Sequence, residues 1–163
     1  QGALGARVRW KGLTLDANLM FASGHKVFER WAWYSMHSGL RSTYYYQGDQ
    51  RLMDRWQQPG DVTDVPKMVY STSSLSGGSG TTSRFLYDGD FMRLRDLSLN
   101  YTLPKSATDA IGFNRVDIFV KGLNLFTWTK DELPFDPEVR ASGNFRITTP
   151  PLKSVSLGVN LNF

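Results

Sequence analysis

The sequence predicts an all-β fold, and specifically part of an antiparallel transmembrane β-barrel. Residues 154–163 alternate strictly between apolar and polar side chains, which is typical of a strand with one apolar face and one polar face. A tilted strand needs about 9–11 residues to cross a bilayer, and this segment has that length. Short turns join the predicted strands at one end and long loops join them at the other, as in outer-membrane barrels.

The composition is compatible with a barrel and excludes several other kinds of protein. The chain has 163 residues and no cysteine, so disulfides and thiolate zinc sites are excluded. The mean hydropathy is −0.35, and no apolar run approaches the ~18 residues of a membrane-spanning helix. The net charge of +4 is spread along the chain, so we expect no nucleic-acid partner. The chain starts at Gln1 rather than at Met, which predicts a piece of a longer polypeptide.

The first two predicted strands, residues 3–10 and 13–21, form a hairpin. Lys11 and Gly12 supply a two-residue turn, in which glycine accepts a positive φ. Trp10 lies at the turn end and Phe21 at the far end, where the interface aromatics of a barrel are found. A soluble hairpin packed on a core explains this segment equally well, so the hairpin alone does not distinguish a membrane barrel from a soluble protein.

Three further strands are predicted, at residues 91–103, 115–128 and 152–163. In the first of them Met92 and Leu94 are out of phase with the apolar positions from Leu97 onward. We therefore expect either a β-bulge near residues 95–96 or a strand end that extends beyond the membrane. We place a similar change of phase in the next strand at Gly122. Five strands cannot close a barrel, because about eight are the minimum, so strands of the same or another chain must complete it.

Two long loops are predicted at residues 22–90 and 129–151, and we expect both on the extracellular side. Within and between the strands only short helical turns are predicted, at residues 50–56 and at residues 106–112 with Ser106 as the N-cap. The Gly- and Ser-rich stretch 71–83 lacks the Gly-Lys-Ser/Thr of a phosphate loop and is predicted to be a mobile loop or tether. With five strands, the carboxy-terminus falls on the short-turn side, which is periplasmic.

The alternation also assigns polar residues to a face. An Arg or Lys on the lipid face costs about 2–4 kcal/mol at the bilayer midplane, so charged residues are predicted to face the lumen. The predicted lumen-facing set is Arg7, Arg9, Asp16, Asn18, Asp117 and Lys121. The apolar set of the last strand is predicted to meet outer-membrane lipid and to act as the terminal signal for the barrel-assembly machinery: Val155, Leu157, Val159, Leu161 and Phe163.

Four blocks of the sequence resemble one protein family. They are YDGDFMRLRDLSLNYTLPK at 87–105, VDIFVKGLNLFTWTK at 116–130, FDPE at 135–138 and the closing LGVNLNF. Together with the RW at 55–56 and the TDVPK at 63–67, they are similar to the carboxy-terminal end of SusC/RagA-type TonB-dependent outer-membrane transporters. The resemblance covers nearly all of the chain, and the order of the blocks is more specific than the Asn-Leu-Phe at 124–126, which many TonB-dependent receptors share.

This resemblance implies a 22-stranded barrel with an amino-terminal plug, capped by a SusD-like surface lipoprotein. Such a transporter imports oligosaccharides or oligopeptides with energy passed from TonB, which contacts the plug region. The plug, the TonB-contacting segment and most of the strands lie outside these 163 residues. We therefore expect the chain to contribute five terminal strands and two extracellular loops to such a barrel.

No catalytic site and no cofactor are predicted, and the chain is not expected to be an enzyme. His25 and His37 lack the spacing of a metal site, and no pair of carboxylates is placed as in a glycosidase cleft. Several acidic residues cluster beside glycine and proline, where turn and cap chemistry explains them better than a structural calcium ion. These residues are Asp88, Asp90, Asp131, Glu132, Asp136 and Glu138.

The first long loop carries more large aromatic rings than a solvated loop needs. Such rings stack on sugar faces or pack against peptide and protein partners. We predict contact with the lid, in preference to direct contact with a glycan or peptide ligand, for Trp31, Trp33, Tyr34, Tyr44, Tyr45, Tyr46 and Trp56. The alternative is that these rings pack the loop on itself.

Two other functions compete with the importer. A secreted β-sandwich module would bind carbohydrate through the Tyr/Trp-rich loop, and its apolar face would be buried against a second sheet. The end of an autotransporter or adhesin barrel is a third interpretation, which an upstream plug domain would exclude.

Overall fold

A computed structural model gives the fold and describes residues 1–36, 48–69, 82–130, 132–138, 143–145 and 149–163. The chain divides into two units, which we describe one at a time. The first comprises residues 1–24, 89–136 and 150–163, and the second comprises residues 25–88 and 137–149. In the described parts of the chain, no helix combines the length and the apolar character needed to span a membrane.

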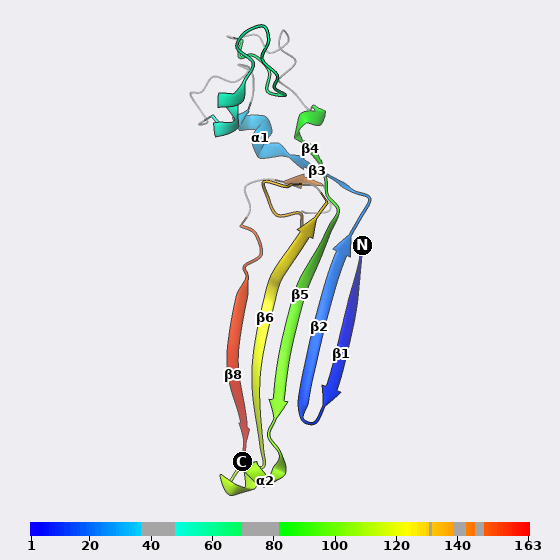
Figure 1. Ribbon diagram of the computed structural model, residues 1–163, viewed down its shortest axis with the longest axis vertical. Helices are drawn as coiled ribbons and strands as arrows, with labels where there is room; N and C mark the ends of the chain where they lie inside the picture. The colour runs from blue at the N-terminus through cyan, green and yellow to red at the C-terminus, as the bar shows by residue number, and fades with distance from the viewer. Residues whose placement is uncertain (37–47, 70–81, 131, 139–142, 146–148) are drawn as a thin grey trace. The chain divides into compact units, whose positions relative to one another are not determined.

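The first unit is built on a five-stranded antiparallel sheet with the order β1-β2-β5-β6-β8 (Figure 1). Its strands are β1 (Gly2–Trp10), β2 (Leu13–Ala22), β5 (Phe91–Thr102), β6 (Arg115–Thr129) and β8 (Ser154–Asn162). Each strand pairs with the strand beside it in chain order, so the sheet is a meander. The five predicted strands are confirmed, and the fold is a partial all-β barrel.

Two short connections join these strands at one end. Lys11 and Gly12 turn β1 into β2 with φ values of 44° and 85°, as a two-residue hairpin of this kind requires. The helix α2 (Lys105–Ala110) lies between β5 and β6. Its N-cap position is occupied by Pro104 and has no side-chain cap, so the prediction that Ser106 caps this turn was wrong. Proline fixes its own φ and disfavours helix before it, which places the helix start directly after Pro104.

The bulge predicted in β5 is present at Arg95. Asn18 of β2 pairs with Asp96, and the next residue, Leu19, pairs with Leu94, so Arg95 is the extra residue. This insertion brings Leu94 and Met92 onto the same face as the apolar residues that follow the bulge, because β2 keeps an unbroken alternation opposite them.

In β6 the change of phase lies two residues beyond the predicted position. Gly122 still pairs in register with Leu97, and Leu123 with Asp96. The break comes where two residues, 124 and 125, oppose Arg95, and Asn124 adopts a left-handed φ of 52°. Leu125 then packs over Gly122, where an added Cβ would meet its Cδ1 at 2.7 Å. The sequence prediction therefore identified the glycine that accommodates the bulge rather than the bulge itself.

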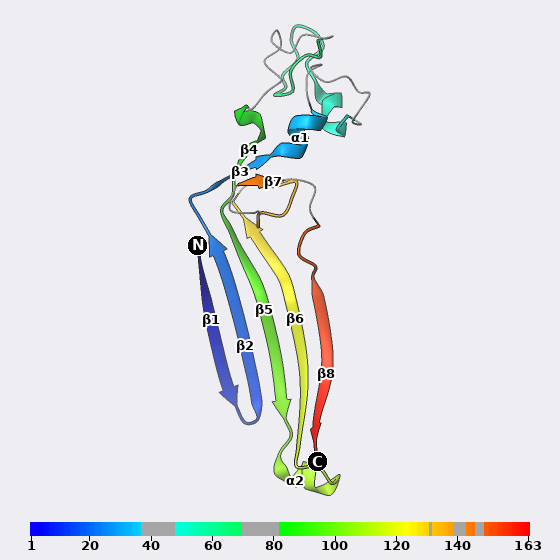
Figure 2. The ribbon, with the colours of Figure 1, turned by 180° about the vertical axis from the view of Figure 1, so that it is seen from behind.

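The second unit contains most of the two predicted loops, and its described residues include helices and strands. Its elements are β3 (Lys26–Glu29), α1 (Arg30–Ser35), the 3₁₀ helices η1 (Gln50–Asp54) and η2 (Ser83–Phe85), β4 (Leu86–Asp88) and β7 (Asn144–Phe145). The central strand β3 pairs antiparallel with β4 and parallel with β7 (Figure 2). Two segments of the first predicted loop and one segment of the second therefore pair in one small sheet.

This unit has the buried hydrophobic cluster of the described chain. Ala32 lies on α1, and Met36 is the residue that caps the end of this helix. Val65 lies in the segment after η1, and Phe85 belongs to η2. Phe28, Trp33 and Leu52 pack against them. Of the Gly- and Ser-rich stretch, residues 71–81 lie outside the described residues.

Candidate functional site

The sheet of the first unit has one face without charge at any paired position. One register row crosses all five strands through Val8, Leu15, Leu99, Val120 and Leu157. The end members of this row, Val8 and Leu157, are 60% and 75% exposed. Five further apolar residues on this face are more than half exposed: Leu4, Trp10, Val155, Val159 and Leu161. An uncovered apolar surface of this extent is typical of a surface that contacts lipid or a partner.

The opposite face of the same sheet is polar and charged. Its next register row runs through Arg7, Asp16, Ser98, Lys121 and Ser156. The register places all six residues of the predicted lumen-facing set on this face: Arg7, Arg9, Asp16, Asn18, Asp117 and Lys121.

Several charges of this polar face are paired, two of them across neighbouring strands. Arg7 Nε contacts Asp16, and Lys121 Nζ lies 3.0 Å from Asp96 Oδ2. Asp117 accepts hydrogen bonds from Thr102 and from Arg115, whose Nε is 2.9 Å from Asp117 Oδ2. Opposite charges placed across neighbouring strands stabilise the register, and here they also keep charge on one side of the sheet.

One charged residue of this face is fully buried. Arg93 of β5 is 1% exposed, and its Nη2 donates to both carboxylate oxygens of Asp136 at 2.7 and 2.6 Å. Asp136 belongs to the FDPE block, so this block is fixed to the polar face by a buried ion pair. The sequence predicted neither Arg93 nor this pairing. The alternation of β5 did contain the signal, since it places an arginine on the polar face beyond the bulge.

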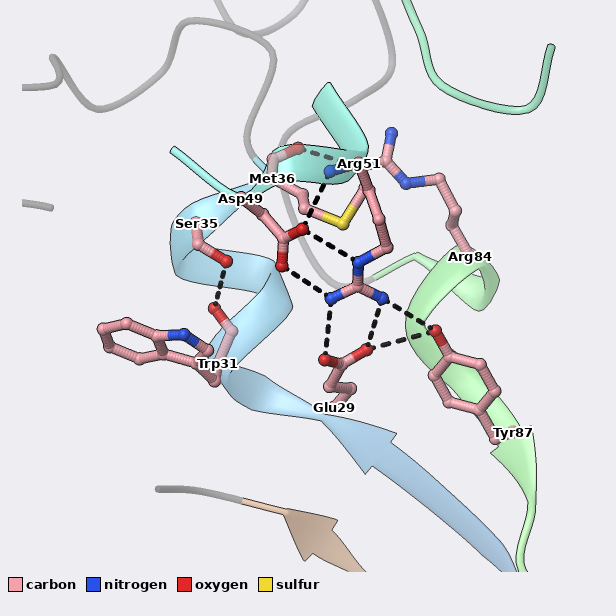
Figure 3. Close-up of polar contacts among 8 residues, drawn as sticks. All are labelled: Glu29, Trp31, Ser35, Met36, Asp49, Arg51, Arg84 and Tyr87. Atoms are coloured by element: carbon pink, nitrogen blue, oxygen red, sulfur yellow. Dashed lines mark hydrogen bonds and ion pairs between the residues drawn. The ribbon is translucent and has the colours of Figure 1, made fainter. Parts of the chain in front are cut away.

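In the second unit, a guanidinium group joins three separate segments (Figure 3). Arg51 of η1 donates through Nη1 and Nη2 to both oxygens of Glu29, at 3.1 and 2.9 Å. Its Nε and Nη2 donate to Asp49 at 3.1 and 2.8 Å, and its backbone N–H donates to Asp49 Oδ1 at 2.9 Å. The Tyr87 hydroxyl of β4 donates to Glu29 Oε2 at 3.1 Å. We call Glu29, Asp49, Arg51 and Tyr87 the Arg51 cluster.

The electrostatics of the Arg51 cluster follow from these contacts. The hydrogen bond from the Arg51 side chain holds the pKa of the Asp49 carboxyl below its usual range. The two carboxylates in turn raise the pKa of Arg51, which keeps the guanidinium charged. Burial is the main cause that raises the pKa of the Tyr87 phenol, with the nearby Glu29 charge as a second cause. Glu29 is only 4% exposed, so its charge needs these partners. The hydrogen bonds of the cluster therefore hold β3, η1 and β4 together.

The predicted aromatic contacts are only partly within the described residues. Trp31, Trp33 and Tyr34 all lie on helix α1, and Tyr34 packs edge-on to Trp33 with ring centroids 4.5 Å apart. Arg30 lies 5.5 Å from the Trp33 ring, and Trp33 packs on the buried cluster of its unit. The backbone N–H of Trp56 donates to Val65, and Lys67 lies 5.6 Å from its ring. Tyr44, Tyr45 and Tyr46 lie outside the described residues.

Three of the acidic residues considered for calcium make other polar contacts. Asp88 pairs with Lys26 at 3.3 Å, Asp90 accepts the backbone N–H of Gly24 at 2.6 Å, and Asp136 pairs with Arg93. Across the described ranges, no three His, Asp or Glu side chains come together in a metal-binding arrangement. Asp131 and His37 lie outside those ranges, and His25 immediately precedes β3.

In sequence, the chain is similar to TonB-dependent receptors. TonB-dependent receptor P3 of Formosa agariphila is 32% identical over 123 residues, which are 69% of this chain and 12% of that protein. TonB-dependent receptor P39 of the same organism is 27% identical over 126 residues, 73% of this chain and 12% of the relative. No protein-family model matches the chain.

Solved structures agree with these sequence relatives. The RagAB peptide importer in its closed-closed state matches 99% of this chain and 16% of its own, with a TM-score of 0.75 and 28% identity. The RagAB peptide transporter matches with the same TM-score and identity, over 99% of this chain and 17% of its own. This chain thus spans about an eighth of the length of the curated relatives that it matches. Its sheet, its two faces and these similarities together show that the chain belongs to the SusC/RagA-type TonB-dependent transporters of the outer membrane.

Proposed function

We propose that this chain is part of an active importer that carries oligopeptides or oligosaccharides across the outer membrane with energy from TonB. The observation that carries the proposal is the pair of neighbouring register rows in the sheet. One row is apolar and exposed across five strands, and the other carries the Arg7–Asp16 ion pair and Lys121, which pairs with Asp96. A sheet with an apolar face and a charged face is suited to form the wall between lipid and a water-filled lumen.

The proposal gives each part of the first unit a role. The apolar face meets lipid, and Arg7, Arg9, Asp16, Asn18, Asp117 and Lys121 face the lumen. β1 and β8 are the two edge strands of the sheet, and the remaining barrel strands pair with them, because an open edge is not tolerated inside a membrane. The short connections and the end of β8 then lie on the periplasmic side, and β8 carries the assembly signal.

The second unit is the part proposed to meet the substrate and the lid on the extracellular side. The similarity to a peptide importer supports oligopeptides, while the aromatic residues of α1 suit glycans as well. We expect a SusD-like surface lipoprotein as the lid and TonB as the partner of the plug, which lies outside this chain. The relatives are receptors and importers, so the role proposed is transport rather than catalysis.

Uptake by intact cells tests the proposal. A strain that carries the full-length transporter takes up a labelled oligopeptide or oligosaccharide mixture, and strains that lack the transporter or TonB serve as the two controls. We expect uptake of at least one class to require both genes. Uptake that is unchanged in either deletion strain contradicts an active importer.

The β-sandwich interpretation has no support in the structure. It requires a second sheet large enough to cover the apolar face of five strands, each nine residues or longer. The other sheet found among the described residues has three strands of two to four residues. A sheet of that size is too small for this task.

A further inference from the structure

A pocket with an apolar wall and an arginine opens in the second unit. Its volume is about 270 Å³. Met36, Val65 and Phe85, all members of the buried hydrophobic cluster, form the apolar wall. Arg84 lines the pocket from η2, and the exposed carboxylates of Asp54 and Asp64 also line it. Arg51 and Tyr87 of the Arg51 cluster complete the lining.

Arg84 is held in place, but its guanidinium group is not satisfied. Nη2 donates to the carbonyl oxygen of Met36 at 2.7 Å, and the group lies over the Phe85 ring at 4.5 Å from the centroid. Its Nε and Nη1 are both buried and have no acceptor among the residues that the structure describes. Arg51, in contrast, has its guanidinium nitrogens bonded to Glu29 and Asp49 (Figure 3).

An arginine in this state favours an incoming acceptor. Buried guanidinium donors are almost always paired, because removing them from water without a partner is unfavourable. Burial is the main cause that lowers the pKa of Arg84, so its surroundings disfavour the charged form. The negative charge of Asp64 raises the pKa of Arg84, although the two side chains form no ion pair in the described part of the chain. A ligand that carries an oxygen acceptor into the pocket would relieve this cost.

We propose that this pocket binds a carboxylate group of the imported oligomer, with Arg84 as the residue that pairs with it. This inference rests on the proposed import function. Guanidinium groups form strong, charge-assisted hydrogen bonds with carboxylates. Asp54 and Asp64 would repel a doubly charged phosphate more than a single carboxylate. The wall of Met36, Val65 and Phe85 suits the carbon skeleton that bears the carboxylate, whether an amino-acid residue or an acidic sugar.

Matched probes test the proposal on the purified full-length transporter. The first pair is N-acetyl-trialanine with a free carboxylate and its carboxy-terminal amide. The second pair is trigalacturonic acid and its methyl ester. Calorimetry is expected to show that the acid of at least one pair binds about tenfold or more tightly than its neutral partner. The pair that shows this preference identifies peptide or acidic glycan as the source of the carboxylate.

Two variants assign the preference to the pocket. Arg84→Gln is expected to bind the acid and its neutral partner equally. Arg55→Gln removes an arginine of the same unit that lies outside this pocket and bonds only to the Leu52 carbonyl in the described contacts, so it should keep the preference. A preference that persists in R84Q, or that is lost equally in R55Q, overturns the proposal.

The comparison of acid and neutral probes on the wild-type protein tests the carboxylate site even if R84Q fails to fold. Equal binding of acid and neutral probes in both pairs, or no measurable binding of either acid, contradicts a carboxylate site. TonB-dependent uptake of the neutral probes is measured in parallel. If that uptake persists without any carboxylate preference, the pocket assignment fails and the importer stands; if all TonB-dependent uptake is absent, the import function itself fails.

Discussion

Arg93 of β5 and Asp136 of the FDPE block form a buried ion pair, with Arg93 Nη2 2.7 and 2.6 Å from the two carboxylate oxygens. Arg93 is 1% exposed, and its Nε also donates to Thr127 Oγ1 at 3.1 Å. A guanidinium group buried to this extent needs its carboxylate partner, which explains why an aspartate stands at this position of the loop. The pair fixes the segment that follows β6 to the polar face of the sheet.

The first prediction concerns this pair. Asp136→Ala leaves the buried Arg93 charge without its carboxylate and should destabilise the loop by about 3–5 kcal/mol, since breaking a buried pair is costly. Amide hydrogen exchange in residues 132–138 should therefore accelerate by at least about a hundredfold, provided that these amides exchange through local opening.

A double variant provides the control for this prediction. Arg93→Met with Asp136→Leu removes both charges and keeps side-chain volume, so it should lose much less protection than Asp136→Ala. If the single and double variants exchange at the same rate, the buried charge is not the cause of the order in this loop.

The second prediction tests the assignment of the two sheet faces. Val159 and Asn160 are neighbours on β8 at nearly the same depth, and they pair with Ile118 and Asp117 on opposite faces. Val159→Arg should cost about 2–4 kcal/mol of folding free energy if its face meets lipid near the midplane. Asn160→Arg places its charge opposite Asp117 and should cost less than about 1 kcal/mol. Folded protein recovered from the outer membrane, measured for both variants, checks this, and equal losses contradict the assignment.

The sheet was predictable because its information is local. In β8 every second residue faces the same environment, so the alternation alone reveals both faces. The bulge at Arg95 was readable for the same reason, since a single extra residue shifts the parity of Met92 and Leu94. The position of the β6 break was less clear, because the left-handed conformation of Asn124 leaves no mark in the hydrophobic pattern.

The second unit was not predictable in the same way. Its strands β3, β4 and β7 have four, three and two residues, which is too short for any period to be read. The pairing of Phe28 with Asn144 joins segments that lie far apart in the chain. The Arg51 cluster likewise combines side chains from three segments, and only Asp49, which caps the helix that contains Arg51, is a sequence neighbour. Nonlocal contacts of this kind leave no spacing signal.

The third prediction concerns the acid stability of the Arg51 cluster. The pKa of Asp49 is lower in the folded unit than in an unfolded chain, because Arg51 donates to its carboxylate. Its contribution to stability is therefore present above the unfolded value of about 4 and is lost as the pH falls through the lower, folded value. Asp49→Asn should reduce the stability of this unit by about 1 kcal/mol at neutral pH and should flatten its pH dependence below about pH 5. Hydrogen exchange of α1 and η1 as a function of pH measures both effects.

The matched control for this prediction is Asp54→Asn. Asp54 is an exposed carboxylate of the same 3₁₀ helix, and it lies outside the Arg51 cluster. This variant should keep the wild-type pH dependence of exchange. If D54N and D49N behave alike, the effect reflects the net charge of the helix rather than the bond between Asp49 and Arg51.

The fourth prediction separates two roles of Phe163. This residue is 90% exposed, and its ring lies edge-on to Phe113 with centroids 6.5 Å apart. If β8 is the terminal signal strand, Phe163→Ala should strongly reduce insertion into the outer membrane, because the assembly machinery reads the aromatic ring. An aromatic pair of this kind contributes only about 0.5–1.5 kcal/mol, so Phe113→Ala, which removes the same ring contact, should leave surface amounts near the wild-type level. Quantitative surface labelling of both variants gives the answer: normal amounts of F163A refute the signal, and equal losses in F163A and F113A assign the effect to packing between the two rings.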